Sequence, residues 1–326
     1  MLAPFLGRSA STLQLNISGS VTAVPAQSHA EDAYRYTDDS LFLPEDRVRV
    51  IRTETGFTVE GAGELLTAVV PLLDHLCIRQ DTAMVHAAMV DYRGAGILLP
   101  AWGGVGKTST VAKLVAMPGV GFMADDWGFI TTDGTLLPYA KPMFIKPHHR
   151  PIYPDLFRGL RKPLAPGWLT STVSSVATAV HPVIVRYPRT AAFTRRWSPE
   201  HRMVHPADVF GAGKIASTAP ARLAIFLERF DGTEATLERR SQAWMAARIV
   251  GNFHSELPLV SRRLIEALGA TGLVPLGEHF SAKTSAIARA LGEVPCFVLR
   301  LPAAWSADRT SDHVAGTVTS MVERQP

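Results

Sequence analysis

The sequence has few of the residues that mark disulfide-rich, disordered or membrane-spanning proteins. It has only two cysteines, Cys77 and Cys296, each in an apolar stretch without metal-ligand spacing, so we expect two free, buried thiols. Charged residues make up only 19% of the chain and hydrophobic residues 47%, a balance that excludes wholesale disorder. The longest apolar segment, "LLTAVVPLLDHLCI", is interrupted by Pro71 and Asp74 and is too short and too polar to span a bilayer.

The chain also lacks targeting signals, internal repeats and a strong excess of one charge. Its first residues show no basic region followed by a long apolar run, so we expect no signal peptide and a soluble, cytoplasmic protein. The formal net charge of +4 suits an anionic ligand but does not by itself indicate nucleic acid. We therefore expect neither a nucleic-acid nor a membrane partner, and the composition leaves open whether the chain forms a homo-oligomer.

Hydrophobic periodicity predicts an α/β protein with two parts. Residues 11–60 alternate in short runs, which favours a small β-rich N-terminal module that we place at residues 1–80, closed by a helix at 64–76. Residues 81–326 alternate strand-like and helix-like segments and are expected to form one α/β domain. Within it, residues 141–220 are rich in proline and basic residues, so we interpret them as an irregular insertion that faces the substrate.

Segments after this insertion return to regular patterns. We expect helices at "QAWMAARIVGNFHSEL", "VSRRLIEALGA" and "SAIARALGE", and strands at "RLAIFLERF", "TGLVPL" and "PCFVLRL". Upstream, "TAMVHAAMVDYRGAGILLP" predicts two strands joined by a turn, the second of them an unbroken apolar run.

A glycine-rich loop follows that second strand. The stretch "GILLPAWGGVGKTST", residues 96–110, fits the phosphate-loop pattern G-x-x-x-x-G-K-[ST], except that Ala101 occupies the first glycine position. At a strand exit a methyl group can be accommodated, and a helix from Lys107 to about Ala116 is expected to follow. In such a loop the backbone amides and the lysine hold phosphates. We expect a nucleotide site formed by Trp102, Gly103, Gly104, Val105, Gly106, Lys107, Thr108 and Ser109.

Two other segments resemble this loop less well. "GAGKIAS", residues 211–217, has Ile215 where a metal-binding hydroxyl is needed. "GEHFSAKTS", residues 277–285, keeps Lys283 but has Ala282 directly before it, where the backbone must approach the phosphates. We interpret the second segment as an ordinary strand–loop–helix connection.

Two adjacent carboxylates end the next apolar strand after the loop. Phosphoryl transfer needs one carboxylate on the metal and another that orients or deprotonates the attacking hydroxyl. Asp125 and Asp126 in "GFMADDWGFI" have the position and the chemistry for both tasks. An isolated pair of this kind more often caps a turn, but its place after a phosphate-type loop favours catalysis.

The segment "VHAAMVDYRGAGILLPAWGGVGKTSTVAKL…GVGFMADDWGFI" resembles the catalytic core of HPr kinase/phosphorylase, which shares a compact P-loop fold with ATP-dependent phosphoenolpyruvate carboxykinase. The resemblance covers about residues 84–130 and consists of His86, the loop 101–108 and the pair Asp125–Asp126 in that order. It implies an HPr-kinase/PEP-carboxykinase-like P-loop core for the α/β domain, with ATP and Mg²⁺ as cofactors.

The resemblance also implies roles for these residues. Asp125 would be the general base toward the acceptor hydroxyl, and Thr108 and Asp126 would bind Mg²⁺, although the two aspartates could exchange roles. Lys107 would act on the phosphates, and His86 would lie near the transferred phosphate beside the aspartate pair.

The chain departs from HPr kinase after the aspartates. HPr kinase has a Glu-x-Arg-Gly stretch there, whereas this chain reads "YAKPMFIKPHHRPIYPD", so HPr is not the expected acceptor. We expect a kinase that acts on a serine-type hydroxyl of a peptide or small molecule, as in kinases encoded with peptide natural products. Candidate substrate or γ-phosphate contacts are Lys146, His148, His149 and Arg150, unless they form a solvated loop; Arg239, Arg240 and Arg248 are further candidates for a phosphate-stabilising arginine.

Two alternatives remain at this stage. One is a carboxykinase-like or phosphorolytic enzyme on the same core. The other is a non-catalytic module that binds and senses nucleotide, which the alanine at position 101 keeps open.

Overall fold

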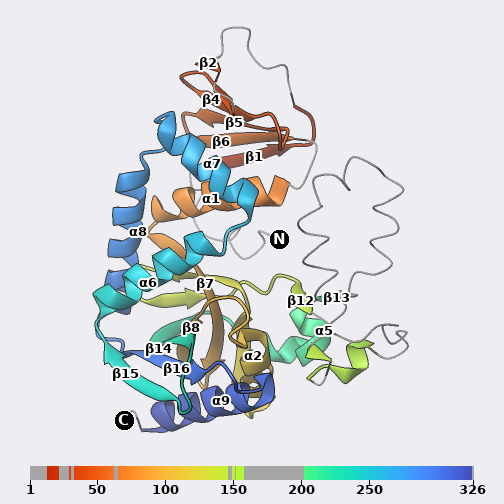
Figure 1. Cartoon of the computed structure of the whole chain (residues 1–326), viewed down its shortest axis with the longest axis vertical. Helices are drawn as coiled ribbons and strands as arrows, with labels where there is room; N and C mark the ends of the chain where they lie inside the picture. The colour runs from red at the N-terminus through yellow and green to blue at the C-terminus, as the bar shows by residue number, and fades with distance from the viewer. Residues whose placement is uncertain are drawn as a thin grey trace. The chain divides into compact units, whose positions relative to one another are not determined.

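A computed structural model describes residues 13–21, 29–30, 33–61, 65–145, 149–150, 152–157 and 202–324 of the chain. The fold is mixed α/β (Figure 1). It divides into two compact units, one formed by Met1–Lys141 with Phe210–Pro326 and the other by Pro142–Val209. None of the helices in the described ranges is both long enough and apolar enough to cross a membrane.

The first sheet of the larger unit is built from the alternating segments near the N-terminus. Its strand order is β1-β6-β5-β4-β3-β2, antiparallel except for the parallel pair β1–β6. One face packs against α1 and α7, which supply apolar side chains to its core. The elements are β1 (Gln14–Ser18), β2 (His29–Ala30), β3 (Arg35–Tyr36), β4 (Ser40–Leu43), β5 (Val48–Thr53), β6 (Gly56–Gly61), α1 (Leu65–Ile78) and α7 (Leu259–Ala270).

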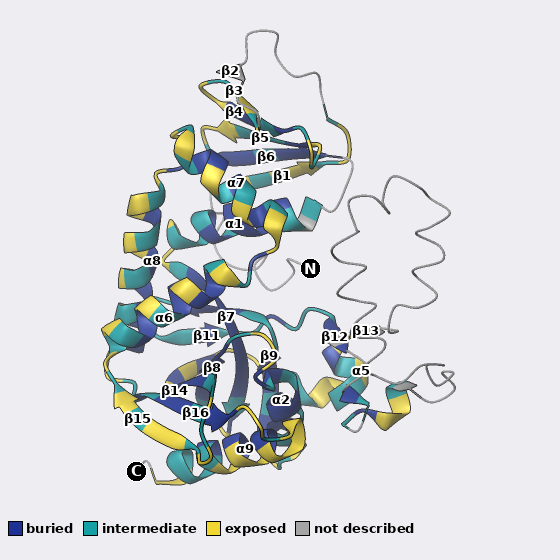
Figure 2. Ribbon diagram, viewed as in Figure 1, coloured by how far each residue is buried: buried dark blue, intermediate teal, exposed yellow. Residues whose placement is uncertain are grey.

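The second sheet carries the glycine-rich loop and the aspartate pair. Its order is β11-β10-β7-β8-β14-β16-β15, and β9 pairs with β7 beside β10. The central strands β8, β14 and β16 run parallel and are largely buried, as Figure 2 shows. The strands are β7 (Thr82–Tyr92), β8 (Ala95–Pro100), β9 (Val120–Ala124), β10 (Trp127–Thr131), β11 (Thr135–Leu137), β14 (Ala219–Phe230), β15 (Thr236–Arg240) and β16 (Cys296–Pro302).

Helices pack on both sheets of this unit. α1 contacts β6 of the first sheet and β7 of the second, and it also packs against α8. α6 and α8 contribute to the main core of the second sheet, while α2 packs against β7, β9 and α9. The bounds of these helices are α2 (Lys107–Ala116), α6 (Gln242–Ser255), α8 (Leu276–Leu291) and α9 (Ala307–Glu323).

The smaller unit contains few regular elements in its described part. β12 (Met143–Ile145) pairs antiparallel with β13 (Arg202–Val204), and a 3-10 turn covers Pro154–Phe157. A short helix, α5 (Pro206–Phe210), ends at the junction with the larger unit. A 3-10 turn over Ala212–Lys214 then leads to β14.

Most of the predicted elements of the larger unit are confirmed. The two strands before the loop are β7 and β8, the helix after it spans Lys107–Ala116 as expected, and the strand before the aspartates is β9. The prediction missed β15 and α9 altogether.

Two related predictions are wrong. "TGLVPL" is a turn rather than a strand, because Gly272 adopts a left-handed φ of 71° and Pro275 precedes the first residue of α8. "GEHFSAKTS" then lies inside that one helix, not in a strand–loop–helix connection. Lys283 is consequently buried within a helix, and its surroundings do not resemble those of a phosphate-loop lysine.

Candidate active site

The middle of β7 brings the three sequence motifs together. His86 pairs across the sheet with Trp127 of β10, directly after the aspartates. The next residue of β7, Ala87, pairs with Pro100, the last residue of β8 before the loop. β9 and β10 pair with opposite halves of β7, so the two aspartates fall at the break between them. This register explains why His86, the loop and the aspartates share one site.

The loop between β8 and α2 has the backbone freedom that its glycines predict. Gly104 has a φ of 78° and Gly106, the N-cap of α2, a φ of 110°, both in the region that favours glycine. Ala101 is fully buried and extends β8 through a parallel bridge to Leu227. The methyl group at the first glycine position is therefore accommodated inside the sheet.

Lys107 lies at the first position of α2 and folds back over the loop. Its Nζ donates to the carbonyl of Ala101 at 2.5 Å and to that of Trp102 at 3.1 Å. Only 9% of its surface is exposed. The lysine thus lies where the loop carbonyls and the N-terminus of α2 converge, as its position in the motif predicts.

Thr108 contacts the first aspartate of the pair. Its Oγ1 donates to Oδ2 of Asp125 at 2.9 Å, and Oδ1 of Asp125 is buried without a hydrogen-bond partner among the described residues. Burial, followed by the charge of Asp126, raises the pKa of Asp125 to about 6, and the hydrogen bond from Thr108 only partly opposes this. The sequence had instead paired Thr108 with Asp126.

Asp126 is held by two different partners and remains more open to solvent. His86 Nε2 lies 2.8 Å from its Oδ1 and Lys141 Nζ 2.7 Å from its Oδ2, and 43% of the Asp126 side chain is exposed. Partial burial would raise the pKa of Asp126, but His86 and Lys141 more than offset it and hold this pKa well below its usual range. Asp126 is therefore ionised at neutral pH.

Asn252 of α6 fixes the other side of His86. Its Nδ2 lies 3.1 Å from the carbonyl of Ala101, 3.2 Å from that of His86, and 3.2 Å from His86 Nδ1. The two carbonyls accept from the amide nitrogen, so Asn252 joins the backbone of His86 to the loop at Ala101 and lies against the Nδ1 side of the imidazole. His86 is therefore held between Asn252 on one side of the ring and Asp126 on the other.

Glu256, four residues further along the chain, contacts the loop itself. The backbone amide of Gly103 donates to its Oε1 at 2.8 Å. A carboxylate therefore occupies one of the amides that a phosphate-binding loop would offer to an anion.

Two of the three candidate arginines form ion pairs with glutamates. Arg248 forms an ion pair with Glu228, and its guanidinium lies 5.8 Å from the ring centre of Trp102 in the loop. Arg240 forms an ion pair with Glu238 on β15 and covers Trp244. Of the two, Arg248 is the one in contact with a loop residue.

The structure describes only part of the basic cluster predicted after the aspartates. Lys146 and His148 lie outside the described residues. His149 is buried and Arg150 partly buried within the smaller unit. Within the described residues, Lys141 contacts Asp126, and its Nζ also lies 5.1 Å from the ring centre of Trp127.

Lys141, Asn252 and Glu256 were missed by sequence reasoning. Lys141 is close enough in sequence to have been considered, because it lies in the same basic stretch that pointed to residues 146–150. Asn252 and Glu256 carry no such signal, since they follow the loop by about half the chain and lie in, or directly after, an ordinary amphipathic helix.

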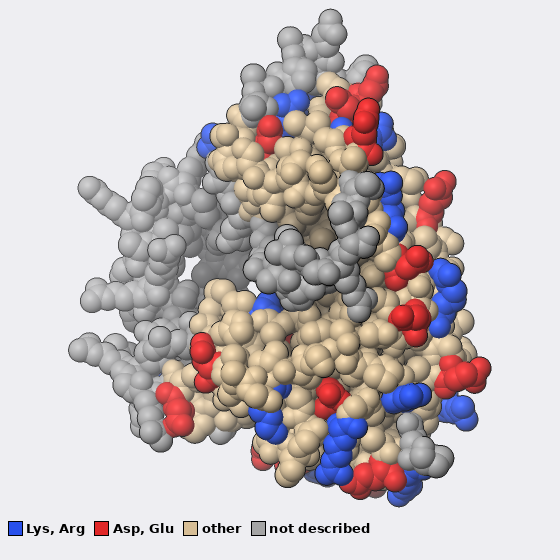
Figure 3. All heavy atoms as spheres, turned by 180° about the vertical axis from the view of Figure 1, so that it is seen from behind, with Lys and Arg blue, Asp and Glu red and all other residues tan. Residues whose placement is uncertain are grey.

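The surface charge is not concentrated by sign on the face shown in Figure 3. Lys and Arg side chains lie interspersed with Asp and Glu over the described part of that face. The mild excess of basic residues in the sequence is therefore not gathered into one basic patch on this side of the described chain.

Comparisons with known proteins add little to this description. No protein-family model matches the chain, and no curated protein matches it. Among solved structures, the Hpr(Ser) kinase/phosphatase from Coxiella burnetii aligns over 73% of this chain and 97% of its own, at 9% identity and a TM-score of 0.31. A similarity this weak says nothing about the chemistry of the present chain, so the function proposed below rests on the side chains of the site.

Proposed function

We propose that the chain is an ATP- and Mg²⁺-dependent kinase that transfers the γ-phosphoryl group to an alcohol. The observation that carries this proposal is a contact at the N-terminus of α2. Thr108, next to Lys107, contacts the carboxylate of Asp125, while the adjacent Asp126 has different partners. Asp125 accepts a hydrogen bond from the Thr108 hydroxyl, and Asp126 is ionised and partly exposed to solvent. Phosphoryl transfer needs these two environments side by side.

The loop and α2 would bind the phosphates. Residues 102–106 and the first turn of α2 offer backbone amides, and an α-helix carries partial positive charge at its N-terminus. The Lys107 ammonium, now held by the carbonyls of Ala101 and Trp102, would turn to a phosphate. We infer that ATP exchanges these internal contacts for contacts to its β- and γ-phosphates.

Thr108 and Asp125 fit a Mg²⁺ ion better than Thr108 and Asp126. The hydroxyl and the carboxylate are already in contact, and Asp125 Oδ1 is a buried acceptor without a described partner, which a cation would satisfy. Oxygen donors of this kind are what Mg²⁺ prefers. When bound there, the ion would neutralise charge on the phosphates. We therefore propose the reverse of the aspartate assignment first expected from the sequence.

Asp126 would then act on the acceptor. Its carboxylate is ionised and partly exposed, and His86 and Lys141 fix its orientation. The acceptor oxygen forms a bond to the γ-phosphorus, the bond from that phosphorus to the β–γ bridging oxygen breaks, and ADP leaves. The hydroxyl proton passes to the Asp126 carboxylate. Catalysis on this scheme is mainly positioning and charge neutralisation.

The acceptor is proposed as a serine-type hydroxyl of a peptide or small molecule, bound in part by residues 141–220. Long irregular segments in compact proteins are often functional, and this one is rich in basic and aromatic residues. Lys146 and Arg150 remain the proposed contacts to acceptor charge.

The test is a phosphoryl-transfer assay on the full chain with γ-labelled ATP. The wild type is incubated with Mg²⁺ and a panel of serine-containing peptides and small alcohols, and Lys107→Ala is measured in parallel. We expect labelled product from at least one acceptor, and its loss in the variant with folding retained by circular dichroism.

Three other outcomes have different meanings. ATP binding without transfer or hydrolysis would indicate a nucleotide-sensing module. Pyrophosphate-forming or phosphate-consuming turnover would indicate a phosphorolytic enzyme. Undiminished transfer by Lys107→Ala would refute the assignment of the loop.

A further inference from the structure

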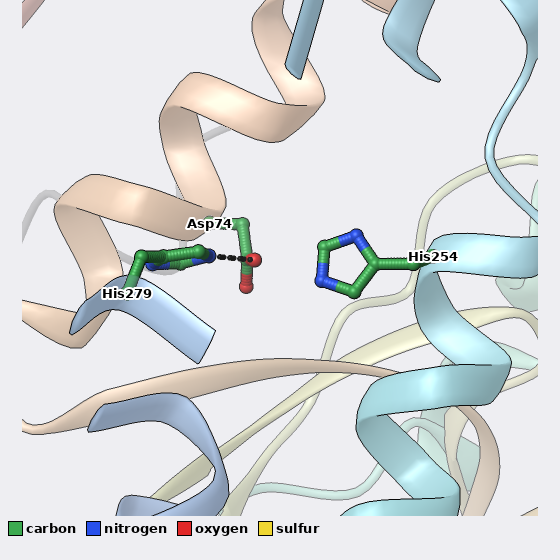
Figure 4. Close-up of side chains that lie close together, drawn as sticks. All are labelled: Asp74, His254 and His279. Carbon is green, nitrogen blue, oxygen red and sulfur yellow. Dashed lines mark hydrogen bonds and ion pairs between the residues drawn. The ribbon is translucent and has the colours of Figure 1, made fainter. Parts of the chain in front are cut away.

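Three helices that are distant in sequence bring an aspartate and two histidines together away from the loop. Asp74 lies on α1, His254 in the last turn of α6 and His279 in the first turn of α8 (Figure 4). Asp74 is 1% exposed and His279 7%. One ligand-type atom from each of the three lies within 4.8 Å of the others.

The Asp74 carboxylate is the centre of this cluster. Its Oδ2 lies 3.1 Å from His279 Nε2 and its Oδ1 lies 2.7 Å from Lys283 Nζ, one turn further along α8. Burial would raise the pKa of Asp74, but Lys283 and His279 together hold this pKa below its usual value. The carboxylate is therefore charged in a position that is almost closed to water.

His254 completes the cluster without a hydrogen bond to it. Figure 4 shows its ring nitrogen directed at the Asp74 carboxylate from the side opposite His279. This atom, Nε2, is buried and has no partner in the described part of the chain. A buried polar atom without a partner is energetically unfavourable, so a ligand at this position would stabilise it.

The cluster also borders a hollow. The hollow is lined by the three residues and by His75, with apolar side chains around them from α1, α7 and the turn before α8, including Leu72, Ile265, Leu268, Val274 and Leu276. A ligand held by the three side chains would therefore have space on one side and apolar walls on the other.

We propose that Asp74, His254 and His279 bind a divalent transition-metal ion, with Zn²⁺ the preferred ion. Two imidazole nitrogens and one carboxylate oxygen form a donor set that suits Zn²⁺, whereas Mg²⁺ and Ca²⁺ prefer oxygen alone. The ion takes the free Nε2 of His254 and replaces the hydrogen bond between His279 and Asp74. Its fourth position faces the hollow and takes water.

The side chains must close slightly around the ion. Neighbouring ligand atoms of a tetrahedral Zn²⁺ site lie ~3.3 Å apart. His279 and Asp74 already meet this spacing, at 3.1 Å. The remaining adjustment falls on His254, the least buried of the three, at the end of its helix. Lys283 stays on the outer carboxylate oxygen, so the ion binds beside a cation and with moderate affinity.

The consequence of the site is structural. The ion joins α1, α6 and α8. α6 carries Asn252 and is followed directly by Glu256, and both residues contact the glycine-rich loop. Metal binding is therefore expected to stabilise the fold in a concentration-dependent way.

The test uses tag-free, full-length protein stripped with a chelator and titrated with Co²⁺ alone, whose visible absorption reports nitrogen and oxygen ligands in a site of low coordination number. We expect one Co²⁺ per chain, displaced by Zn²⁺, and a Zn²⁺-dependent rise in the melting temperature. His254→Ala and His279→Asn should each weaken binding by about tenfold or more, while the exposed His313→Ala should not. His279→Asn keeps a hydrogen-bond donor toward Asp74, so this variant is expected to fold, and its loss of metal binding would not reflect unfolding.

Two results would overturn the site. One is the absence of stoichiometric Co²⁺ absorption in the folded wild type. The other is absorption and Zn²⁺ stabilisation that persist unchanged in both His254→Ala and His279→Asn. Neither readout depends on the kinase reaction, so the site and the proposed function can fail separately.

Discussion

The hydroxyl of Thr108 donates to Asp125 at 2.9 Å, while Asp126, the next residue, contacts His86 and Lys141 instead. Adjacent residues at a strand end point their side chains in different directions. The two carboxylates therefore have separate partners, and the kinase proposal assigns them separate tasks.

Removing the charge of Asp125 and removing that of Asp126 should have different effects on nucleotide affinity and on kcat. Asp125→Asn should weaken Mg²⁺-dependent nucleotide binding, with partial recovery at high Mg²⁺, because it removes a proposed metal ligand. Asp126→Asn should leave nucleotide affinity nearly unchanged and lower kcat by about 10²–10⁴-fold. Isothermal titration with ADP and steady-state kinetics measure both. A metal effect at position 126 would exchange the roles, and small, identical effects would exclude a catalytic pair.

Asn252 should act through His86. Asn252→Ala removes the amide that contacts His86 at Nδ1 and at its carbonyl, so the imidazole loses its fixed orientation toward Asp126 and kcat should fall by about 10²-fold. A double-mutant cycle with His86→Ala is the measurement. We expect the effect of Asn252→Ala on kcat to disappear in the His86→Ala background. Fully additive effects would mean that Asn252 acts through the loop carbonyl of Ala101 instead.

Glu256 should compete with phosphate for the loop. Its carboxylate accepts the Gly103 amide, and its charge opposes an anion at the same position. Glu256→Gln keeps an acceptor but removes the charge, so ATP should bind about fivefold more tightly, a difference of ~1 kcal/mol. Glu293→Gln, a change of the same kind at an exposed residue beyond α8, is the control. Weaker ATP binding in Glu256→Gln would show that the carboxylate supports the loop.

Lys283 should matter for stability and not for phosphate binding. Its ammonium is fully buried, pairs with Asp74 and lies 3.3 Å from the ring centre of Phe253. Lys283→Met leaves the buried carboxylate without its main partner and should cost about 3–5 kcal/mol in the free energy of unfolding. Urea unfolding in the presence of a chelator measures this. Lys113→Met, which breaks ion pairs to the exposed Asp308 and Asp312, should cost less than about 1 kcal/mol.

The two cysteines are free, Cys296 buried as expected and Cys77 only partly buried, and both should resist alkylation in the native protein. Burial, with the Asp74 carboxylate, raises the pKa of Cys77 to about 12, and burial raises that of Cys296 to about 11. A raised thiol pKa means that the thiolate, which is the reactive form, appears only as the pH approaches these values. Iodoacetamide at about pH 8 should therefore label neither cysteine before unfolding and both after it. Native labelling at the rate of the unfolded chain would contradict the burial of that thiol.

Local features of the sequence were sufficient for the loop and for its flanking elements. An apolar run, a cluster of glycines and Lys107 at a helix start specify β8, the loop and α2 through contacts between near neighbours. The same holds for the aspartates, since an apolar strand that ends in two carboxylates can be recognised without knowledge of its partners. The presence of both motifs was therefore predictable, as was the expectation that His86 lies near them.

Only the tertiary structure decided which side chains meet. The choice between Asp125 and Asp126 for Thr108 depends on where β9 ends and β10 begins along β7, a matter of register between strands. Lys141, Asn252 and Glu256 enter the site through contacts that no local pattern encodes.

The clearest case is "GEHFSAKTS", where local pattern and tertiary context disagree. Read alone, its glycine, lysine and threonine imitate a phosphate loop. In the fold it forms part of a helix, and its lysine is buried because Asp74, on a helix about two hundred residues earlier, supplies the opposite charge. The sequence by itself determined the elements and the residue types of the loop, because these depend on neighbours along the chain. The pairing of charges across elements was decided by packing, because burial makes an unpaired charge too costly to keep.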